Sequence, residues 1–432
     1  MGSNRMGWWS LGIFAMVILV VGCKHEDVEP PATALSLPGD GFVVVANSEF
    51  EVAGRASDNE GLVSVTAVLF ETFTEQIVQT TSIAISGMET DFSFRMPAGD
   101  RYTEGGDYTL RVTAADKAGN EGSAFLQITV QALPLEFKGL VWAGESGGGA
   151  FSIFTQDTAG NVLSGPGGLN SMVDLLMDSR NGQIVAAQSN AGVLSAWDFE
   201  EFTPMFQTTL PQGTGTETFS GIAMNRNGFY AAVRVPEYLR SYRFDGSPKN
   251  NFEQVLYPGT AVMATSDKVY LGVSGILGSP RKLDVYDIAN ESLEATQVLD
   301  WDVLRILAID ADEILVCGNS SGLGRIFVLD RQSLIRNQET ELLEGFRDAV
   351  TANGRVWVLT DSGMMEYFPS NGTLSSVLMA GDFSALGVDA ARNRLFIGST
   401  DRIDIVTGAG ALLGMVQGGF GDVRFISTYY NR

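Results

Sequence analysis

The sequence has almost no histidine or cysteine, the side chains that most often titrate or bind transition metals near neutral pH. Its 432 residues include one histidine and two cysteines. The histidine, His25, lies two residues after Cys23, directly behind an apolar N-terminal run and outside any predicted folded domain. Histidine metal sites, Ser-His-Asp triads and Cys-His dyads are therefore excluded.

Basic residues and helical patterns are also scarce. The chain has 28 Lys and Arg against 51 Asp and Glu, which gives a net charge of -23. Such a surface repels phosphate backbones, so we expect no nucleic-acid partner. After the N-terminus no long stretch has helical periodicity, whereas short alternating runs and 50 glycines favour strands and tight turns. The fold class is predicted to be all-β.

The apolar run from Trp8 to Gly22 is shorter than the ~20 residues that a membrane-spanning helix needs. With Arg5 before it, the run is typical of a secretion signal. Its end, Val20-Val21-Gly22-Cys23, resembles the lipobox of bacterial lipoproteins, in which a small residue precedes the cysteine that takes the lipid. We predict a signal peptide over 1–22, and a lipidated Cys23 with its linker over 23–32. An uncleaved anchor with an incidental cysteine is the alternative.

The residues after Cys23 bear on the location. Lys24 followed by Glu26 and Asp27 resembles the export signal of surface lipoproteins of Bacteroidetes, although a solvated linker would have the same composition. Two or three acyl chains, such as palmitate, hold a protein stably on a membrane. The expected location is the outer membrane, lipid-anchored and facing the cell exterior, with a periplasmic orientation as the alternative. With Cys23 lipidated, an intrachain disulfide to Cys317 is excluded.

Residues 33–132 are predicted to form a β-sandwich. Short alternating runs such as "LVSVTAVLF" and "YTLRVTAAD" are separated by turn clusters such as "SDNEG" and "DKAGNEG". The stretch "GGDYTLRVTAADKAGNEGSAFLQITV" resembles the end of a bacterial immunoglobulin-like domain. The resemblance implies that Tyr108 is the corner tyrosine, whose hydroxyl bonds back to the backbone. Antibody-type domains have a cysteine two residues later, where this chain has Leu110.

Acidic and amide side chains in two turns of this segment are weak candidates for a calcium site. They are Asp58, Asn59, Glu60, Asp116, Asn120 and Glu121. Carboxylate and amide oxygens suit Ca²⁺, but turn residues of these types also bond their own backbone, and the spacing matches no EF-hand. Apart from this possibility of calcium we expect no cofactor.

Residues 137–432 contain a repeat of about 43 residues, which predicts the fold. Equivalent core strands begin at Leu140, Ile184, Phe229, Val269, Ile314, Val356 and Leu395. Each belongs to a unit of four short strands, which is the pattern of a β-propeller blade. The segment resembles the broad YncE-like and quinoprotein-like propellers of secreted bacterial proteins, a likeness of fold only.

The two ends of the repeat region complement each other. The final stretch "DVRFISTYYN" has the pattern of a first strand with nothing after it, and the unit at Leu140 lacks a first strand. We therefore predict a seven-bladed propeller that is closed by the C-terminal strand, because closure removes the unpaired edges of an open ring. Cys317 aligns with alanine or glycine in five other units, so we expect it to be a buried, inert thiol; the five are Ala187, Ala232, Gly272, Gly398 and Ala143.

Two sets of residues recur at equivalent positions and are the candidate ligand-binding residues. Aromatic residues precede the first strands, and basic residues are expected in the loops between second and third strands. The candidates are Trp301, Phe346 and Phe383, with Tyr238, Arg240, Arg281, Lys282, Arg325 and Arg402; Phe219, Tyr257 and Phe420 extend the aromatic set. Aromatics beside arginines suit a glycan or an acidic peptide. The alternative is structural, with aromatics in the core and arginines paired with nearby acids.

The sequence favours a non-catalytic surface lipoprotein whose propeller binds or scaffolds a protein or glycan partner. Sialidase Asp-boxes are absent, and no spacing singles out a carboxylate pair. Whether the chain is an enzyme stays uncertain, and catalysis is the less favoured reading. Two alternatives remain: a carbohydrate-active enzyme that uses two carboxylates, and an accessory subunit of an outer-membrane transport or secretion complex.

Overall fold

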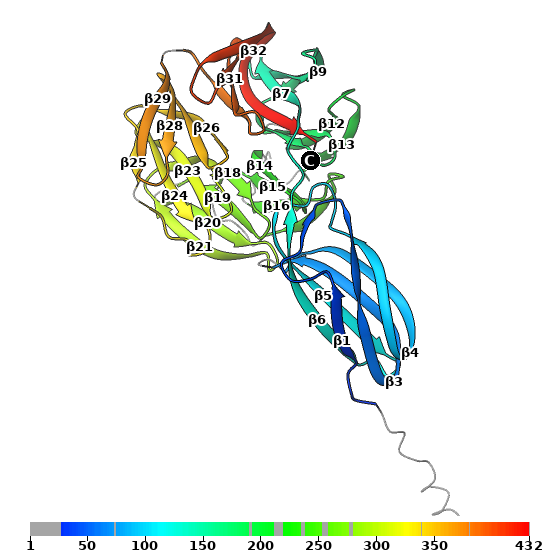
Figure 1. Ribbon diagram of the computed structural model, residues 1–432. Helices are drawn as coiled ribbons and strands as arrows, with labels where there is room; N and C mark the ends of the chain where they lie inside the picture. Colours follow the sequence, from blue (N-terminus) through cyan, green and yellow to red (C-terminus); the bar gives the residue numbers. More distant parts are fainter. Residues whose placement is uncertain are drawn as a thin grey trace, which may run out of the picture. The chain divides into compact units, whose positions relative to one another are not determined.

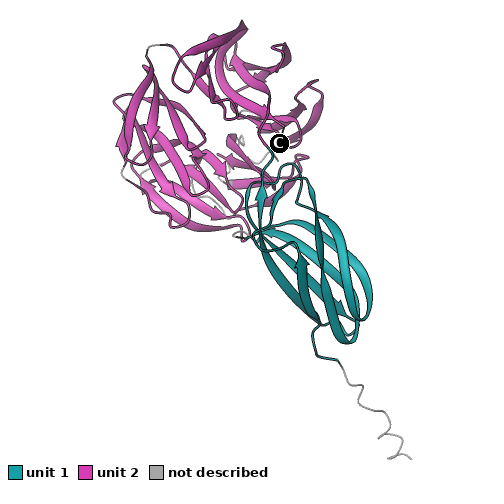
Figure 2. Cartoon of the chain, viewed as in Figure 1, with its two compact units in different colours: residues 1–133 teal, residues 134–432 magenta. Residues whose placement is uncertain are grey.

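The computed structural model describes residues 27–72, 75–189, 192–210, 219–234, 238–252, 258–275, 280–337, 339–379 and 381–431. The chain divides into two compact units, Met1–Leu133 and Pro134–Arg432 (Figure 2). Throughout these described ranges the regular structure is β-strand, as the composition and the short alternating runs predict (Figure 1). No helix in this part of the chain is long and apolar enough to cross a bilayer.

The first unit is built from six strands, two of them much longer than the sequence pattern suggests. They are β1 (Ala32–Leu37), β2 (Val43–Val45), β3 (Glu49–Glu71), β4 (Ile77–Pro97), β5 (Gly106–Asp116) and β6 (Glu121–Gln131). The register between β3 and β4 shifts between Ser57 and Leu62, so each strand has two parts with different neighbours. The turn cluster "SDNEG" thus lies inside β3 rather than between two strands.

The two parts of β3 pair with different strands. Residues 53–57 of β3 pair with β1, whereas residues 62–71 pair with β5. β5 pairs in turn with β6, and β6 pairs in parallel with β2. One hydrophobic cluster, with residues from β2 to β6, forms the core of this unit; it includes Val52, Val65, Leu110 and Val112. Alternating buried and exposed residues along β3 and β5 supply this core, as expected for strands with one covered face.

The second unit is a β-propeller. Five of its sheets have four antiparallel strands in sequence order. They are β10 (Met172–Asp178), β11 (Gln183–Gln188), β12 (Val193–Asp198) and β13 (Pro204–Thr209); β14 (Phe219–Asn225), β15 (Gly228–Val233), β16 (Tyr238–Tyr242) and β17 (Pro248–Asn251); β18 (Gly259–Ala264), β19 (Lys268–Val273), β20 (Arg281–Asp287) and β21 (Ser292–Leu299); β22 (Asp302–Ala308), β23 (Glu313–Ser320), β24 (Leu323–Asp330) and β25 (Thr340–Glu341); and β26 (Phe346–Ala352), β27 (Arg355–Thr360), β28 (Gly363–Phe368) and β29 (Thr373–Met379).

The remaining strands of this unit join its beginning to its end. They form a six-stranded sheet of β30 (Ala385–Asp389), β31 (Arg394–Thr407), β32 (Leu412–Tyr430), β7 (Phe137–Glu145), β8 (Ala150–Asp157) and β9 (Val162–Asn170). Residues 412–417 of β32 pair with β31, and residues 422–430 pair with β7. Asp401, with a φ of 55°, sits at a turn inside β31. The last strand of the chain therefore pairs with the first strand of the unit.

Neighbouring sheets of the propeller pack face to face through hydrophobic clusters. Among the described residues, one cluster joins β10–β12 to β14–β16, and similar clusters join each later sheet to the next. Another joins β7 and β8 to β10 and β11. Within the six-stranded sheet, Trp142 and Phe154 of β7 and β8 pack against Phe396 and Ile403 of β31. The sheet is therefore folded so that its two ends face each other.

Candidate functional site

The first strands of the propeller sheets share one irregularity. β10, β14, β18, β22 and β26 each shift register near their start, and residues 422–430 of β32 do the same. The residue after each shift pairs with an equivalent position of the neighbouring strand, which holds a small residue in most sheets: Asp174 pairs with Ala187 and Arg305 with Cys317, whereas Asp348 pairs with Leu359. We call these residues, together with Ala385, which pairs with Gly398 at the equivalent position of β30 without a shift, the channel ring: Asp174, Gly221, Ala261, Arg305, Asp348, Ala385 and Phe425.

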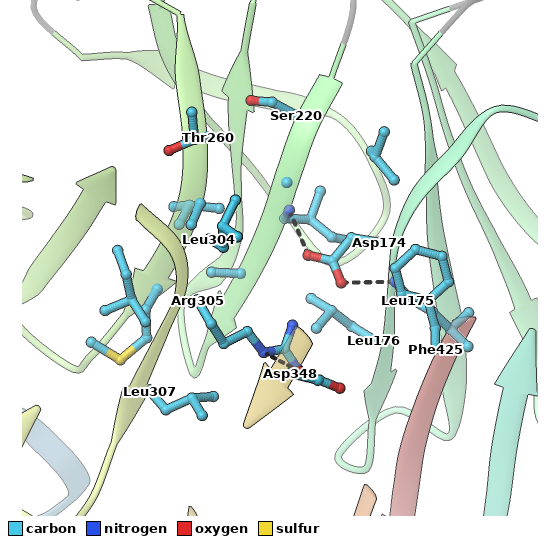
Figure 3. Close-up of a pocket in the computed structure, with 18 of the residues that line it drawn as sticks. Asp174, Leu175, Leu176, Ser220, Thr260, Leu304, Arg305, Leu307, Asp348 and Phe425 are labelled. Carbon is cyan, nitrogen blue, oxygen red and sulfur yellow. Dashed lines mark hydrogen bonds and ion pairs between the residues drawn. The ribbon is translucent and has the colours of Figure 1, made fainter. Parts of the chain in front are cut away.

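The channel ring surrounds a cavity of about 380 Å³, the central channel of the propeller. Residues from β10, β14, β18, β22, β26, β30 and β32 line it (Figure 3). Three charged members of the ring point into this space: Asp174, Arg305 and Asp348. We refer to these three residues as the charged triad. Charged side chains are rarely placed deep inside a protein unless they are paired or have a function.

The two aspartates of the triad bind backbone amides in the same way. Asp174 accepts hydrogen bonds from its neighbour Leu175 (2.9 Å) and from Ile222 of β14 (3.1 Å). Asp348 accepts them from Ala349 (2.8 Å) and from Leu386 of β30 (2.9 Å). First strands have a sheet partner on one side only, so these carboxylates satisfy N–H groups at the inner edge and tie adjacent sheets together.

Arg305 has unused hydrogen-bonding capacity. Its Nε lies 3.4 Å from Oδ1 of Asp348, which is an ion pair and not a hydrogen bond. No described residue accepts a hydrogen bond from its terminal nitrogens, Nη1 and Nη2. Its side chain is 35% exposed although it lies deep in the channel, so the exposed part faces the cavity. A guanidinium in this state can hold a carboxylate or a phosphate with two parallel hydrogen bonds.

The charges of the triad influence one another. Burial raises the pKa of Asp174, and Arg305 and the two amide donors offset only part of that effect. Burial alone would lower the pKa of Arg305, but Asp348 and Asp174 outweigh it, so the pKa is raised. Arg305 therefore stays cationic, whereas Asp174 takes up a proton more readily than an exposed aspartate does.

The channel wall carries hydroxyl groups on one side of the charged triad, where Val173 and exposed Leu304 also line it, and aliphatic groups on the other. Ser220, Thr260 and Ser384 come just before the ring positions in their chains, and Thr260 Oγ1 is buried with no hydrogen-bond partner. Half-buried Leu176, Met224, Met263 and Leu307 follow the ring positions and line the same cavity. Figure 3 shows Ser220 and Thr260 on one side of Asp174 and Arg305, and Leu176 and Leu307 on the other.

The aromatic residues singled out from the sequence lie in the core. Trp301 is fully buried between β18–β20 and β22–β24, Phe346 packs in the next cluster, and Phe383 packs in the one after it. Phe219 and Phe420 are buried in the same manner, and Tyr257 lies outside the described residues. None of the described aromatics of this set lines the central channel.

The basic candidates were expected in loops, but the structure places them in strands: Tyr238 and Arg240 in β16, Arg281 and Lys282 in β20, Arg325 in β24 and Arg402 in β31. At Arg325 the reason is a tight preceding turn: Ser320 pairs directly with Leu323, and only Ser321 and Gly322, both with positive φ, form the turn.

Most of these basic side chains have acidic partners. Arg281 pairs with Asp302 at 2.9 Å, Lys282 with Asp284 at 2.7 Å, and Arg402 with Asp404 at 2.5 Å. Arg325 lies 2.5 Å from Glu341, and the guanidinium carbon of Arg240 lies 5.6 Å from the ring centre of Tyr242. The structure does not bring them together with the predicted aromatics around the channel.

Two of the calcium candidates meet at one end of the first unit. One carboxylate oxygen from each of Asp27, Asp58 and Asp116 lies within 4.8 Å of the others. Asp116 is 4% exposed and binds Asn120, whereas Oδ2 of Asp27 and Oδ1 of Asp58 are buried with no hydrogen-bond partner. Glu121 is exposed and does not belong to the group. Asp27 had not been included among the candidates, because it lies in the predicted linker.

Cys317 is a free, fully buried thiol. Burial raises its pKa, and the nearby Asp348 adds to the effect, so the thiolate that a nucleophile needs is strongly disfavoured. Cys23, the predicted lipidation site, lies outside the described residues. Tyr108 donates its hydroxyl hydrogen bond to the carbonyl oxygen of Glu104 at 2.9 Å, which is the backbone tie predicted for a corner tyrosine.

Sequence reasoning missed the charged triad. The signal was present in the first strands, which otherwise read as apolar: "VDLLMD", "LRILAI" and "RDAVTA" place a charged residue at one aligned position. These strand residues were not predicted as a site, because ligand sites are expected on loops more often than inside strands. The three strands lie far apart in sequence, and only ring closure brings their charges into one cavity.

No protein-family model matches the chain, and no curated protein matches it in sequence. Solved structures resemble it in fold. A computationally designed protein, Ika8, is 14% identical over 68% of this chain and 88% of its own, with a TM-score of 0.50. A functionally unknown protein from Desulfotomaculum acetoxidans is also 14% identical, over 68% of this chain and 99% of its own, with a TM-score of 0.50.

The β-propeller domain of Cps50 (Swd1) from Myceliophteria thermophila is 11% identical over 60% of this chain and 90% of its own, with a TM-score of 0.47. Identities this low indicate a shared fold and carry no information on ligand or activity. The repeated four-stranded sheets show that this chain contains a β-propeller.

Proposed function

We propose that the chain is a non-catalytic binding protein whose propeller holds an anionic group of its ligand in the central channel. The observation that carries the proposal is Arg305, which lies deep in the cavity with two terminal nitrogens that have no partner among the described residues. A guanidinium that faces a cavity without such a partner has donors free to bind a ligand or water. The partner is a protein or a glycan at the outer membrane.

The location is part of the same proposal. The lipobox ending at Cys23, and the lysine and acidic residues after it, support a lipid-anchored protein of the outer membrane that faces the cell exterior. Metabolic labelling with an alkyne-bearing palmitate analogue tests this directly. We expect incorporation into the wild type and none into a Cys23→Ser variant. Equal labelling of both would rule out the lipoprotein assignment.

We propose that the propeller has seven blades and is closed by its C-terminal strand. The six-stranded sheet counts as two blades, because β31 turns at Asp401 and β32 divides between two partners. Packing of Trp142 and Phe154 against Phe396 and Ile403 supports this count, since the two halves face each other as separate blades do. Closure protects the edges that an open ring would expose.

We propose an immunoglobulin-like sandwich for the first unit, which acts as a spacer between the lipid and the propeller. The bend in β3, the parallel pairing of β2 with β6 and the hydrogen bond from Tyr108 to Glu104 support it. The domains are then residues 33–132 and 137–432.

Binding without turnover is tested with the purified protein on arrays of glycans and peptides, followed by calorimetry and assays for hydrolysis. The proposal expects saturable binding that is weakened by Arg305→Met, with no product formed. Binding that is unaffected by Arg305→Met would contradict the channel as the site. Product formation by the wild type would contradict a purely binding role.

One observation favours catalysis as a second candidate. Asp174 and Asp348 are two carboxylates in one cavity, and burial raises the pKa of Asp174. Two carboxyl groups whose environments differ are the pair that glycosidases use. This candidate expects glycoside hydrolysis that Asp174→Asn abolishes without loss of binding. Hydrolysis unchanged in that variant would exclude it.

We also propose that calcium binds between Asp27, Asp58 and Asp116. Two of their oxygens are buried without partners, and Ca²⁺ prefers such carboxylate ligands. Calcium should raise the melting temperature of the wild type, whereas Asp58→Asn should remove that increase and Glu121→Gln, at an exposed neighbour, should keep it. An equal increase in the Asp58→Asn variant would contradict the site.

A further inference from the structure

The channel ring is open between Asp174 and Arg305. The strands that lie between them in ring order, β14 and β18, contribute Gly221 and Ala261. The nearest atoms to a Cβ added at Gly221 belong to Val262 and Asp174, at 3.5–3.9 Å, which is ordinary contact distance. Small residues at these two positions therefore leave space beside Arg305.

The hydrogen-bond donors that face this space belong to Arg305. Asp348 holds only the Nε edge of the guanidinium, at 3.4 Å. The Nη1 and Nη2 groups then form a fork whose spacing matches the two oxygens of a carboxylate. A cation is a poor match for this position, because its charge would face that of Arg305.

The wall beyond the triad is aliphatic and partly exposed. Met224, Met263 and Leu307 are half-buried and line the cavity, and Figure 3 shows Leu307 on the side away from Ser220 and Thr260. Exposed apolar surface inside a cavity gains free energy when an apolar group covers it. A sugar would place hydroxyl groups against this wall and would lose hydrogen bonds to water there.

We infer that the central channel recognises a carboxylate joined to a short aliphatic group, with the carboxylate on Arg305 and the aliphatic group against Met224, Met263 and Leu307. This inference rests on the proposed binding function and specifies its ligand. A free aliphatic acid and a peptide that ends in an aliphatic residue both carry this chemistry. The hydroxyl of Thr260, which has no partner, lies on the side where the amide of such a peptide would enter.

Isothermal titration calorimetry of the full protein with acetate, butyrate and 4-methylpentanoate tests the two halves of the site. Affinity should rise about fourfold for each added methylene group. 4-Methylpentanamide, which lacks the charge, and glucuronate, which lacks the aliphatic group, should both bind at least tenfold more weakly. A peptide ending in leucine should bind only with its carboxylate free, and comparison with 4-methylpentanoate shows which source is preferred.

Variants identify the residues. Arg305→Met should weaken 4-methylpentanoate binding by about tenfold to a hundredfold, because charge-assisted hydrogen bonds are lost. Gly221→Leu should block the space while keeping every charge, and it guards against misfolding of the Arg305 variant. Arg243→Met, at an exposed arginine that does not line the channel, is the matched control and should leave affinity unchanged.

The outcomes separate this inference from the function on which it rests. Glucuronate or the amide binding as tightly as 4-methylpentanoate, with both still dependent on Arg305, would overturn the inference and keep the channel as the binding site. Binding of arrayed ligands that neither Arg305→Met nor Gly221→Leu weakens would overturn both. Tight carboxylate binding that is lost in both variants supports both.

Discussion

Removal of the last strand is the perturbation that tests the propeller most severely. Deleting residues 423–432 takes away the partner of β7 and exposes the side of the first sheet that β32 covers. Val423 is fully buried and Ile426 is 8% exposed, and each contributes about 1.5–3 kcal/mol when buried. Half-buried Phe425, Tyr429 and Tyr430 and the lost strand pairing bring the total to roughly 5–9 kcal/mol, which is comparable with the whole stability of a typical protein.

We expect the truncated protein to lose the cooperative melting transition of the propeller, or to melt at least about 10 °C lower. Differential scanning calorimetry measures this and can record a separate transition for the first unit. Point variants refine the result: Ile426→Ala should cost about 2–5 kcal/mol, whereas Leu413→Ala, at a side chain 56% exposed in the same strand, should cost less than about 0.5 kcal/mol. A truncated protein as stable as the intact one would refute closure by the C-terminal strand.

Three further predictions concern single residues. Asp174→Asn should change how stability depends on pH. Because the pKa of Asp174 is raised in the folded state, protonation of Asp174 favours folding at low pH, and this contribution is lost as the pH rises. The melting temperature of the variant should therefore rise relative to that of the wild type above about pH 4; the other charged groups lining the cavity are Arg305, Asp348, Arg347 and Arg424. A constant difference across pH would contradict it. Cys317 should resist iodoacetamide in the folded protein at pH 8 and react after unfolding, and mass spectrometry would detect a contrary, rapid labelling. Tyr108→Phe should cost about 1 kcal/mol in urea unfolding through the lost hydrogen bond to Glu104, and no change would show that the bond contributes nothing.

The repeat allowed much of the propeller to be predicted. Strand starts such as Ile184 and Val356 recur because each blade needs the same buried positions, and β11 and β27 include them. The final stretch was predicted to pair with the first unit of the repeat, and residues 422–430 pair with β7. The slot at Cys317 was predicted to be small and buried, and the register of β22 with β23 places it opposite Arg305.

The first unit was harder to predict in detail. Turn-forming residues at 58–61 suggested that one strand ends there, whereas β3 continues through them with a shift in register. A bulge of this kind depends on the partners of the strand on both sides, which a single sequence does not specify.

The candidate site illustrates another limit. The aromatic and basic residues could be found in the sequence because they repeat. In the structure, however, Trp301 is part of the hydrophobic core, and Arg281 forms an ion pair with Asp302. The charged triad does not repeat from blade to blade, since the ring positions hold Asp, Gly, Ala, Arg, Asp, Ala and Phe in turn. A sequence repeat reveals the core positions that all blades share, whereas a binding site in a propeller depends on residues that differ between blades.

The most direct measurement is the NMR signal of the Arg305 side chain. In protein labelled with ¹⁵N-arginine, the resonances of the Nε and Nη groups that disappear in Arg305→Met belong to this residue. Titration with 4-methylpentanoate should shift them progressively to saturation and leave those of Arg243 in place. If every arginine resonance is unmoved at saturating ligand, or if only exposed arginines shift, the central channel is not the binding site.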